Sequence, residues 1–235
     1  EHLKNPSINA IEEYFKTYYV PENMAICISG DVDPKETIKL IEKEFFRLKS
    51  SEKTLKTPEW REKPLKGREF VQMNYQGEEQ VLLAFRTVPR KHDDWAALRL
   101  LDMVLDNSVA GLINLNLVEA QAVRSAGSFP QNLNDYGAQY LQGIPKDDQT
   151  LQEVEELLLS QIEIIKKGEF ADWVLPAVIN DFKKRRKQDL ENNQKRVEFM
   201  RDAFLSFHAW EDVVTEIDLL GQVTKDDVIR VANQY

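Results

Sequence analysis

The change in hydrophobic period near residue 149 constrains the fold of this chain more than any other feature. Before it, four segments have the apolar runs or two-residue alternation of β-strands, at residues 69–75, 80–88, 122–129 and 136–143. After it, the pattern is helical almost to the end. Strands followed by helices, with short hairpin-like connections, predict an α+β fold in which a mainly antiparallel sheet packs against helices.

The predicted helices are recognised by apolar residues at helical spacing and by residues that cap their ends. Ser7 and Asp33 are predicted N-caps, and Pro34 suits a first helical turn because its missing N–H would have no partner there. Asp93 or Asp94 is expected to cap a third helix. The predicted helical segments are residues 7–18, 34–48, 94–105, 109–117, 151–168, 170–190, 194–207, 211–219 and 224–235.

Two further segments suggest how the chain is divided. Residues 24–29, MAICIS, form an apolar run with the pattern of a strand between the first two helices. Residues 50–67 are rich in Lys, Glu, Ser, Thr and Pro, have little periodicity, and are interpreted as a linker. We therefore expect a helix–strand–helix remnant of a preceding homologous domain at residues 1–49, and an α+β domain at residues 68–235.

The last helical segment repeats the first. Both begin with a hydroxyl residue, Ser7 and Thr224, and both carry apolar residues at offsets 4, 8 and 11 from it. The copies start 224 − 7 = 217 residues apart, which suits two whole homologous domains rather than a solenoid. Coincidence is the alternative, since capped amphipathic helices are common. If the copies are equivalent, we expect the chain to be an excised piece, with the second domain truncated at its C-terminal end.

Composition excludes several classes of protein. The net charge is 31 − 40 = −9, so a phosphate backbone would be repelled and nucleic acid is not an expected partner. No apolar run approaches the roughly 20 residues that a membrane helix needs. The single cysteine, Cys27, excludes an intrachain disulfide and is expected to be a small buried hydrophobe. This composition is compatible with the cytoplasm and with a bacterial periplasm.

Several short passages occur in an order that is specific for one family. The first are YYVPENM at residues 18–24 and ISGDVD at residues 28–33; later passages are residues 112–123, DYG at 135–137, KGEF at 167–170 and TKDDV at 224–228. In this order they resemble the insulinase/pitrilysin family of zinc metallopeptidases, and the resemblance covers nearly the whole chain.

The resemblance implies half-molecules of two similar α+β domains, as in the mitochondrial-processing-peptidase-like fold. The 217-residue spacing of the repeated helix agrees with this. It also implies that active members carry an inverted zinc motif, His-x-x-Glu-His, and a distant Glu ligand, all in the first domain. Peptides would be enclosed between two halves and cleaved by a zinc-bound water, with Glu as the base.

The sequence itself lacks that zinc motif. Its three histidines, His2, His92 and His208, include no pair four residues apart. We therefore expect no catalytic and no metal-ligating residue in this chain, with zinc held by the parent protein upstream of Glu1. The family's substrate-contacting Arg and Tyr correspond to Val118 and Ser125 here. The absence of this Arg and Tyr has two explanations. The chain is a supporting domain in the first half of the parent, where the pair is not needed, or it is a domain of an inactive half.

A supporting domain can still wall a chamber, exclude water and offer strand edges or apolar pockets to peptides. Phe129, Tyr136 and Tyr140 are the predicted peptide contacts, with packing on the sheet as the alternative role of each. The expected partners are the missing catalytic domain, the other half of the parent, peptide substrates, and a second copy paired through the unpaired strand at residues 24–29.

Two other functions are compatible with the sequence. One is an inactive structural or scaffold homologue that assembles with partner subunits without proteolysis. The other is an unrelated α+β ligand-binding domain, for which the two copies of the repeated helix would not be structurally equivalent.

Overall fold

The computed structural model describes residues 4–50, 61–107 and 110–235. The chain divides into two compact units, and each is described here by itself. Unit 1 comprises Glu1–Pro64 and Leu190–Phe207, and unit 2 comprises Leu65–Asp189 and His208–Tyr235. Most of the expected linker, residues 51–60, lies outside the described residues.

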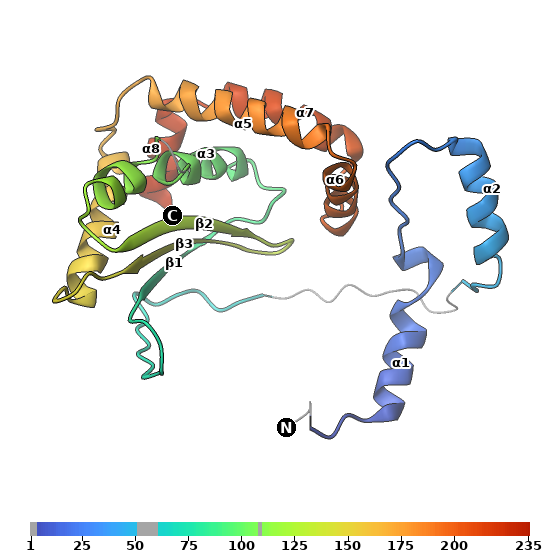
Figure 1. Cartoon of the computed structure of the whole chain (residues 1–235). Helices are drawn as coiled ribbons and strands as arrows, with labels where there is room; N and C mark the ends of the chain where they lie inside the picture. The colour runs from blue at the N-terminus through green and yellow to red at the C-terminus, as the bar shows by residue number, and fades with distance from the viewer. Residues whose placement is uncertain (1–3, 51–60, 108–109) are drawn as a thin grey trace. The chain divides into compact units, whose positions relative to one another are not determined.

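A three-stranded antiparallel sheet is the framework of unit 2 (Figure 1). It consists of β1 (Val81–Thr87), β2 (Ser125–Asn132) and β3 (Gly137–Ile144), in the spatial order β1-β3-β2. Because β3 is central, both of its edges are paired: Leu141 lies opposite a β1 residue on one side and a β2 residue on the other. The strands predicted around residues 80–88, 122–129 and 136–143 are confirmed.

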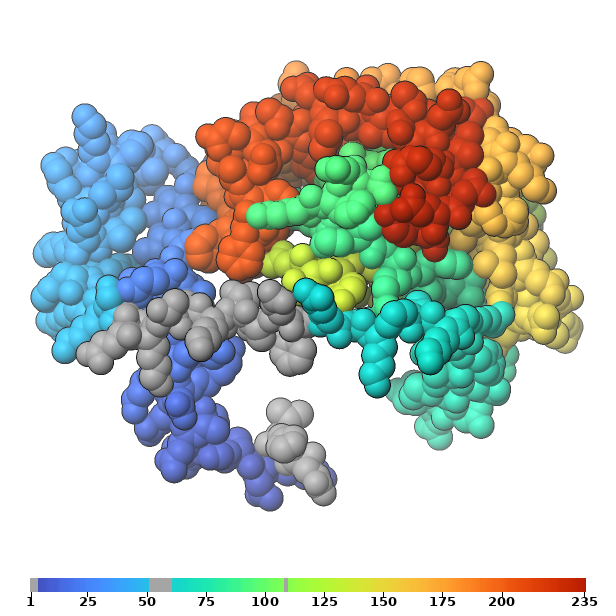
Figure 2. All heavy atoms as spheres, turned by 180° about the vertical axis from the view of Figure 1, so that it is seen from behind, coloured from blue at the N-terminus to red at the C-terminus, as the bar shows by residue number. Residues whose placement is uncertain are grey.

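Within the described part of unit 2, helices cover one face of this sheet, and no helix of the unit covers the other (Figure 1). α3 (Trp95–Leu105) packs against α8 (Lys225–Gln234), and α4 (Leu151–Lys166) contacts α8, β1 and β3. α5 (Val174–Leu190) and α7 (Trp210–Gln222) form an outer layer over α3. Figure 2 shows the opposite side of the molecule, with α8 in red beside α3 in green.

The core of unit 2 lies between the sheet and these helices. Every second residue of β3 is buried, as expected of a strand with one face against a helical layer. The largest fully buried side chains are Leu100, Leu105, Ile113, Leu117, Leu141, Leu158, Ile165 and Leu220. The predicted α+β architecture, an antiparallel sheet packed against helices, is confirmed. Among the described helices, none is long and apolar enough to span a membrane.

Local signals set several helix ends, although Asp94, one of the two caps expected for α3, makes no capping hydrogen bond through its side chain. Thr224 forms a capping box with Asp227 at the start of α8, and Thr150 forms one with Glu153 at the start of α4. Gly168 follows α4 with a φ of +70°, the left-handed conformation that favours glycine. A Cβ there would also lie 2.8 Å from Ile229 Cδ1, so α8 packs directly against this turn.

The helix expected at residues 109–117 starts later than predicted. It begins at Leu112 and continues as a π-helical segment, η2 (Asn114–Glu119). A Cβ at Gly111 would lie 2.8 Å from the Leu105 carbonyl oxygen. The chain therefore folds back closely on the end of α3 at this glycine, which leaves no room for an earlier start. Residue 109 itself lies outside the described residues.

Unit 1 consists of helices and extended chain. Its elements are α1 (Ile8–Tyr18), the short 3₁₀ helix η1 (Pro21–Asn23), α2 (Pro34–Phe45) and α6 (Asn193–Leu205). The caps predicted at Ser7 and Asp33 are confirmed, because each side chain accepts a hydrogen bond from the backbone N–H three residues later. The Ser29 hydroxyl donates to Asn193 Oδ1 at 3.1 Å, which joins residues far apart in sequence within this unit.

The described part of unit 1 has almost no core of its own. Neither α1 nor α2 contains a buried residue, although both are amphipathic. Val20, which lies between α1 and α2 in the sequence, is buried, and so is Ala203 of α6. The expectation that Cys27 is buried is wrong, since this side chain is half-exposed. The apolar faces of both N-terminal helices are therefore accessible in the described structure.

Two segments predicted as strands are not strands. Residues 69–75 and residues 24–29 are extended but unpaired, and the alternating apolar side chains of both are exposed. A strand requires a neighbour to satisfy its backbone N–H and C=O groups. The apolar pattern of each segment is suited to a sheet, but no described strand lies alongside it.

Gly143 allows a direct test of the packing between β3 and α4. A Cβ at this position would overlap Val154 Cγ1 and would lie 3.2 Å from Leu158 Cδ1, and both of these side chains are fully buried. We expect Gly143→Ala to lower the free energy of unfolding by ~1–3 kcal/mol through overpacking. Chemical denaturation monitored by circular dichroism measures this change. Gly77→Ala is the control, because its Cβ would meet only the exposed ring of Tyr75; an equal effect of both substitutions would contradict the packing.

Candidate functional site

The helix-free face of the sheet carries the aromatic residues that the sequence singled out. The register places Phe129 of β2 directly opposite Tyr140 of β3, which in turn lies opposite Ala84 of β1. Residues directly opposite one another in an antiparallel sheet point to the same face. Phe129, Tyr140 and Ala84 therefore form a row across the three strands.

Phe129 and Tyr140 stack on each other, and we call this pair the aromatic platform. Their ring centroids are 5.2 Å apart and the rings are inclined by only 13°. Phe129 is 45% exposed, so the platform is open to solvent on one side. The Tyr140 hydroxyl donates to Gln131 Oε1 at 3.1 Å, which fixes the orientation of the ring. An exposed and oriented aromatic surface can bind apolar or aromatic side chains.

Tyr136 lies apart from this pair, in the connection between β2 and β3. The guanidinium of Arg86 lies over its ring, 5.8 Å from the centroid. Sequence reasoning missed Arg86 and Gln131 as neighbours of the aromatic residues. The two-residue alternation of β1, in which Arg86 follows Ala84 on the same face, was the available signal. Two of the three predicted contacts are thus brought together, and the third is paired with a cation.

A buried polar network fixes the strands beneath the platform. Asp102 of α3 accepts hydrogen bonds at Oδ1 from the Ser128 hydroxyl, at 2.5 Å, and from Gln139 Nε2, at 2.7 Å. Four residues later on α3, Asp106 Oδ2 accepts from the Ser128 backbone N–H at 3.1 Å. Burial raises the pKa of the Asp102 carboxyl, although the bonds from Ser128 and Gln139 and the charge of Arg99 oppose this rise.

The aromatic platform and the polar network lie on opposite faces of the same two strands, β2 and β3. Ser128 precedes Phe129 and Gln139 precedes Tyr140, and neighbouring residues of a strand point to opposite faces. The hydrogen bonds to Asp102 therefore hold the backbone that carries both aromatic rings. This arrangement makes the platform a rigid surface, as a recognition site requires.

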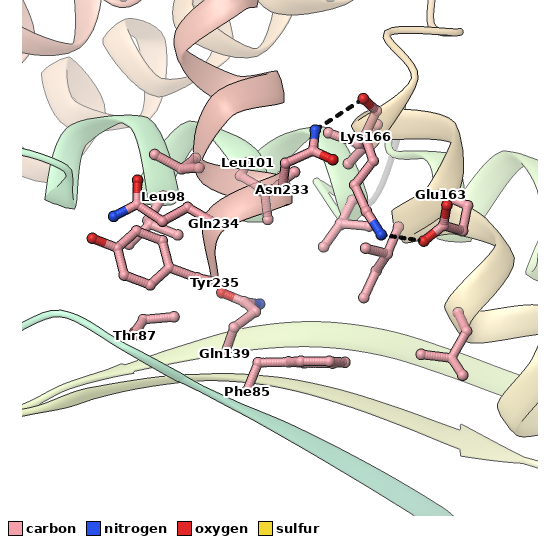
Figure 3. Close-up of a pocket in the computed structure, with 16 residues that line it drawn as sticks. Phe85, Thr87, Leu98, Leu101, Gln139, Glu163, Lys166, Asn233, Gln234 and Tyr235 are labelled. Atoms are coloured by element: carbon pink, nitrogen blue, oxygen red, sulfur yellow. Dashed lines mark hydrogen bonds and ion pairs between the residues drawn. The ribbon is translucent and has the colours of Figure 1, made fainter. Parts of the chain in front are cut away.

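A second candidate site is a cavity on the helical side of unit 2, which we call the α8 pocket (Figure 3). It has a volume of about 510 Å³ and lies between β1, β3, α3, α4 and the end of α8. Its lining is mostly apolar, with Phe85, Leu98, Leu101, Ile162, Val231 and Ala232. Lys166 and Glu163 form an ion pair on α4 at 2.5 Å and belong to the same lining.

Polar contacts at the start of α3 hold α8 beside this pocket. Arg230 donates to Asp94 Oδ1 at 2.6 Å, and the Tyr235 hydroxyl donates to Asp94 Oδ2 at 2.7 Å. The Arg230 hydrogen bond lowers the pKa of Asp94. Burial, together with the bond to Asp94, raises the pKa of Tyr235 to about 12. Tyr235 is therefore a neutral hydrogen-bond donor near neutral pH.

Across residues 4–50, 61–107 and 110–235, no three His, Cys, Asp or Glu side chains gather closely enough to hold a metal. His92 Nδ1 accepts from the Asp94 backbone N–H at 3.1 Å and lies 3.8 Å from the Asp94 carboxylate. His2 lies outside the described residues. Val118 lies in η2 and Ser125 is the first residue of β2.

A family model matches most of the chain. The model is described as the peptidase M16 inactive domain and matches residues 7–182. A curated zinc protease of Helicobacter pylori, PqqE, is 24% identical over 242 residues, which cover 100% of this chain and 54% of that protein. The chain therefore spans about half the length of the curated relative that it matches.

Solved structures share the fold. The crystal structure of a protease from Helicobacter pylori superposes with a TM-score of 0.92 at 22% identity, over 99% of this chain and 57% of that one. The first half of the periplasmic protease PqqL from Escherichia coli superposes with a TM-score of 0.65 at 14% identity, over 99% of this chain and 53% of that one.

The buried carboxyl of Asp102 predicts a pH-dependent effect on stability. Because its pKa is raised in the folded chain, the stabilisation that it contributes is complete below the ordinary value of 3.8 and is lost as the pH rises through the raised value. Asp102→Asn keeps an oxygen acceptor without the buried charge. We expect this variant to gain stability relative to the wild type as the pH rises above the ordinary carboxyl value of 3.8, by at most ~1.4 kcal/mol per pH unit.

Urea unfolding at several pH values tests this prediction. Asp93→Asn is the matched control, since this side chain is exposed at the entrance to α3. A stability difference between Asp102→Asn and the wild type that is the same at every pH would contradict the prediction.

Proposed function

Because the chain belongs to the family of peptidase M16 inactive domains, we propose that it is the non-catalytic portion of a zinc-dependent metalloendopeptidase and helps to form the chamber that encloses peptide substrates. The match to residues 7–182 carries this proposal. The similarity to a curated zinc protease about twice as long supports it, because a protein of that length has room for a separate catalytic domain.

The expected partners follow from this proposal. The catalytic domain of the parent would hold the zinc ion, which supplies a bound water as the nucleophile in this type of chemistry. In this chain, the accessible apolar faces of α1 and α2 are suited to packing against such a domain. We propose that residues 1–49 belong to that preceding domain and that residues 68–235 form the supporting domain.

The helix-free face of the sheet supports a role in holding peptides. The aromatic platform is exposed and rigidly held, and β2 beside it is an edge strand. An extended peptide can pair with an edge strand through its backbone while its side chains contact the exposed face. Phe129 and Tyr140 would then contact apolar side chains of the peptide, and Tyr136 would lie at the end of the same strand pair.

A scaffold role without proteolysis is the second candidate function. Val118 and Ser125 favour it, because they stand where the resemblance to the zinc peptidases implies an Arg and a Tyr that contact the substrate. A valine offers no hydrogen bond, and the serine at the start of β2 is too short to replace a tyrosine. A supporting domain in the first half of an active peptidase would also lack this Arg and this Tyr.

The proposal predicts that the purified chain is inactive by itself. We expect less than one zinc ion per chain after dialysis, measured by elemental analysis, and no cleavage of fluorogenic peptides. One zinc ion per chain, removed by a chelator together with peptidase activity, would overturn the assignment as a non-catalytic portion.

Peptide binding provides the second test. We expect Phe129→Ala to weaken binding of a fluorescein-labelled, extended peptide rich in Phe and Leu by roughly five- to tenfold, because one aromatic contact contributes about 1 kcal/mol. Fluorescence anisotropy measures the affinity. Trp173→Ala is the control, since Trp173 is an exposed aromatic residue that is not on the sheet. Equal affinities of the two variants would favour the scaffold role.

A further inference from the structure

Arg86 is the one charged side chain that β1, β2 and β3 point to the helix-free face of the sheet. It lies directly opposite Ala138 of β3, and Ala138 precedes Tyr140 by two residues on the same face. Arg86 is therefore a diagonal neighbour of Tyr140, with their Cβ atoms about 7–8 Å apart. The other strand positions on this face hold only apolar residues, Tyr, Ser, Gly and Gln. A single cation thus stands beside the aromatic platform.

The ring of Tyr136 orients this cation. The guanidinium of Arg86 lies over the ring, 5.8 Å from its centroid. Stacking uses the flat face of the guanidinium, whereas a carboxylate binds to the N–H groups along its edge. Contact with the ring and with a carboxylate are therefore compatible. Arg86 is half-buried, so a carboxylate that reaches it is partly shielded from water, which strengthens the attraction.

The composition of this face suits a ligand that binds and leaves more than a permanent cover by another domain. The cores of permanent interfaces are depleted of charged residues, whereas Arg86 shares this face with Gln131 and Gln142. Gln142 Nε2 donates to Gln80 Oε1 at 2.5 Å, and Gln131 accepts from the Tyr140 hydroxyl. The side chains on this face are exposed or half-buried. It is therefore unlike the apolar faces of α1 and α2, which are suited to packing against a domain of the parent.

The outer edge of β2 limits how a peptide can approach the platform. The Ser128 N–H donates to Asp106 Oδ2 at 3.1 Å, so it points away from β3 and is already bonded. Pro130 is the next residue that points its backbone outward, and it has no N–H. The edge beside Phe129 therefore offers no N–H to an added strand. Backbone pairing is confined to the ends of this edge, and a peptide that covers the platform continues across the face toward β3 and β1.

The spacing of an extended peptide matches the spacing of the platform and Arg86. Side chains two residues apart in an extended chain point to the same side and lie about 7 Å apart. A peptide that crosses the face can therefore contact the platform with one side chain and Arg86 with the next on that side. The group complementary to a guanidinium is a carboxylate, which it can bind through two parallel hydrogen bonds.

Building on the proposed function, we propose that Arg86 selects the peptides that unit 2 holds: its guanidinium binds a carboxylate of the peptide while an apolar or aromatic side chain about two residues away lies on the aromatic platform. The carboxylate belongs to an Asp or Glu side chain or to the C-terminus of the peptide. The net charge of −9 does not prevent this contact, because charges more than about 8 Å away are largely screened at physiological ionic strength.

Three peptides of equal length with a central Phe and the same N-terminal fluorophore test the proposal. The first has Glu two residues on either side of Phe, the second has Gln at both positions, and both end in an amide. The third has no acidic side chain and ends in a free carboxylate two residues after Phe. We expect the whole wild-type chain to bind the first about five times more tightly than the second in fluorescence anisotropy, as for a partly exposed ion pair. Tighter binding of the third than of the second would identify the C-terminus as a source of the carboxylate.

Arg86→Gln tests whether this residue causes the preference. We expect the variant to bind the Glu and Gln peptides equally, with its affinity for the Gln peptide unchanged. Lys184→Gln is the matched control, since it removes one positive charge from an exposed position on α5, and it should keep the preference. Thermal unfolding monitored by circular dichroism verifies that both variants are folded. An equal loss of preference in both variants would overturn the assignment to Arg86.

The peptides also separate this proposal from the proposed function. Equal affinities of all three for the wild type, each weakened by Phe129→Ala, would overturn the carboxylate site and leave the peptide-holding role of the platform intact. Absence of binding of every peptide would overturn both.

Discussion

The pairing of backbone groups along β3 is the constraint on which unit 2 depends. This strand is hydrogen-bonded to β1 on one side and to β2 on the other, and its alternate residues are buried under α3 and α4. The helical layer, the α8 pocket and the aromatic platform are all positioned by it. Where no neighbouring strand is available, equally apolar segments stay extended and exposed, as residues 24–29 and 69–75 do.

The sequence predicted the parts of this fold that local signals determine. Caps at Ser7, Asp33 and Thr224 and the glycine at position 168 define helix ends through bonds or torsion angles within a few residues. The strands around residues 80–88, 122–129 and 136–143 follow from alternation and β propensity. Residues 69–75 have the same alternation but lack a partner. Pairing is a long-range property, so the pattern could not separate this segment from true strands.

The candidate site was predictable as a set of residue types but not as an arrangement. Phe129 and Tyr140 were recognised individually, but their stacking depends on the register between β2 and β3. Asp102 lies in a strongly apolar helix and gave no functional signal. Its role emerges only when Ser128 and Gln139 are brought to it from two different strands. A single carboxylate thus connects the helical layer to the strands that carry the platform, and its burial raises its pKa as a consequence of the same contacts.

The contact between the start of α3 and α8 has a consequence for how this protein is made in the cell. Asp94 binds Arg230 and Tyr235, which lie 136 and 141 positions later in the chain. Until residues 225–235 have been synthesised, α3 lacks its contact with α8, although β2 and α7 are already available to it. Unit 2 therefore cannot complete its core before residue 235 has left the ribosome. A nascent chain stalled before α8 would expose the leucines of α3 and would be a substrate for chaperones that bind apolar segments.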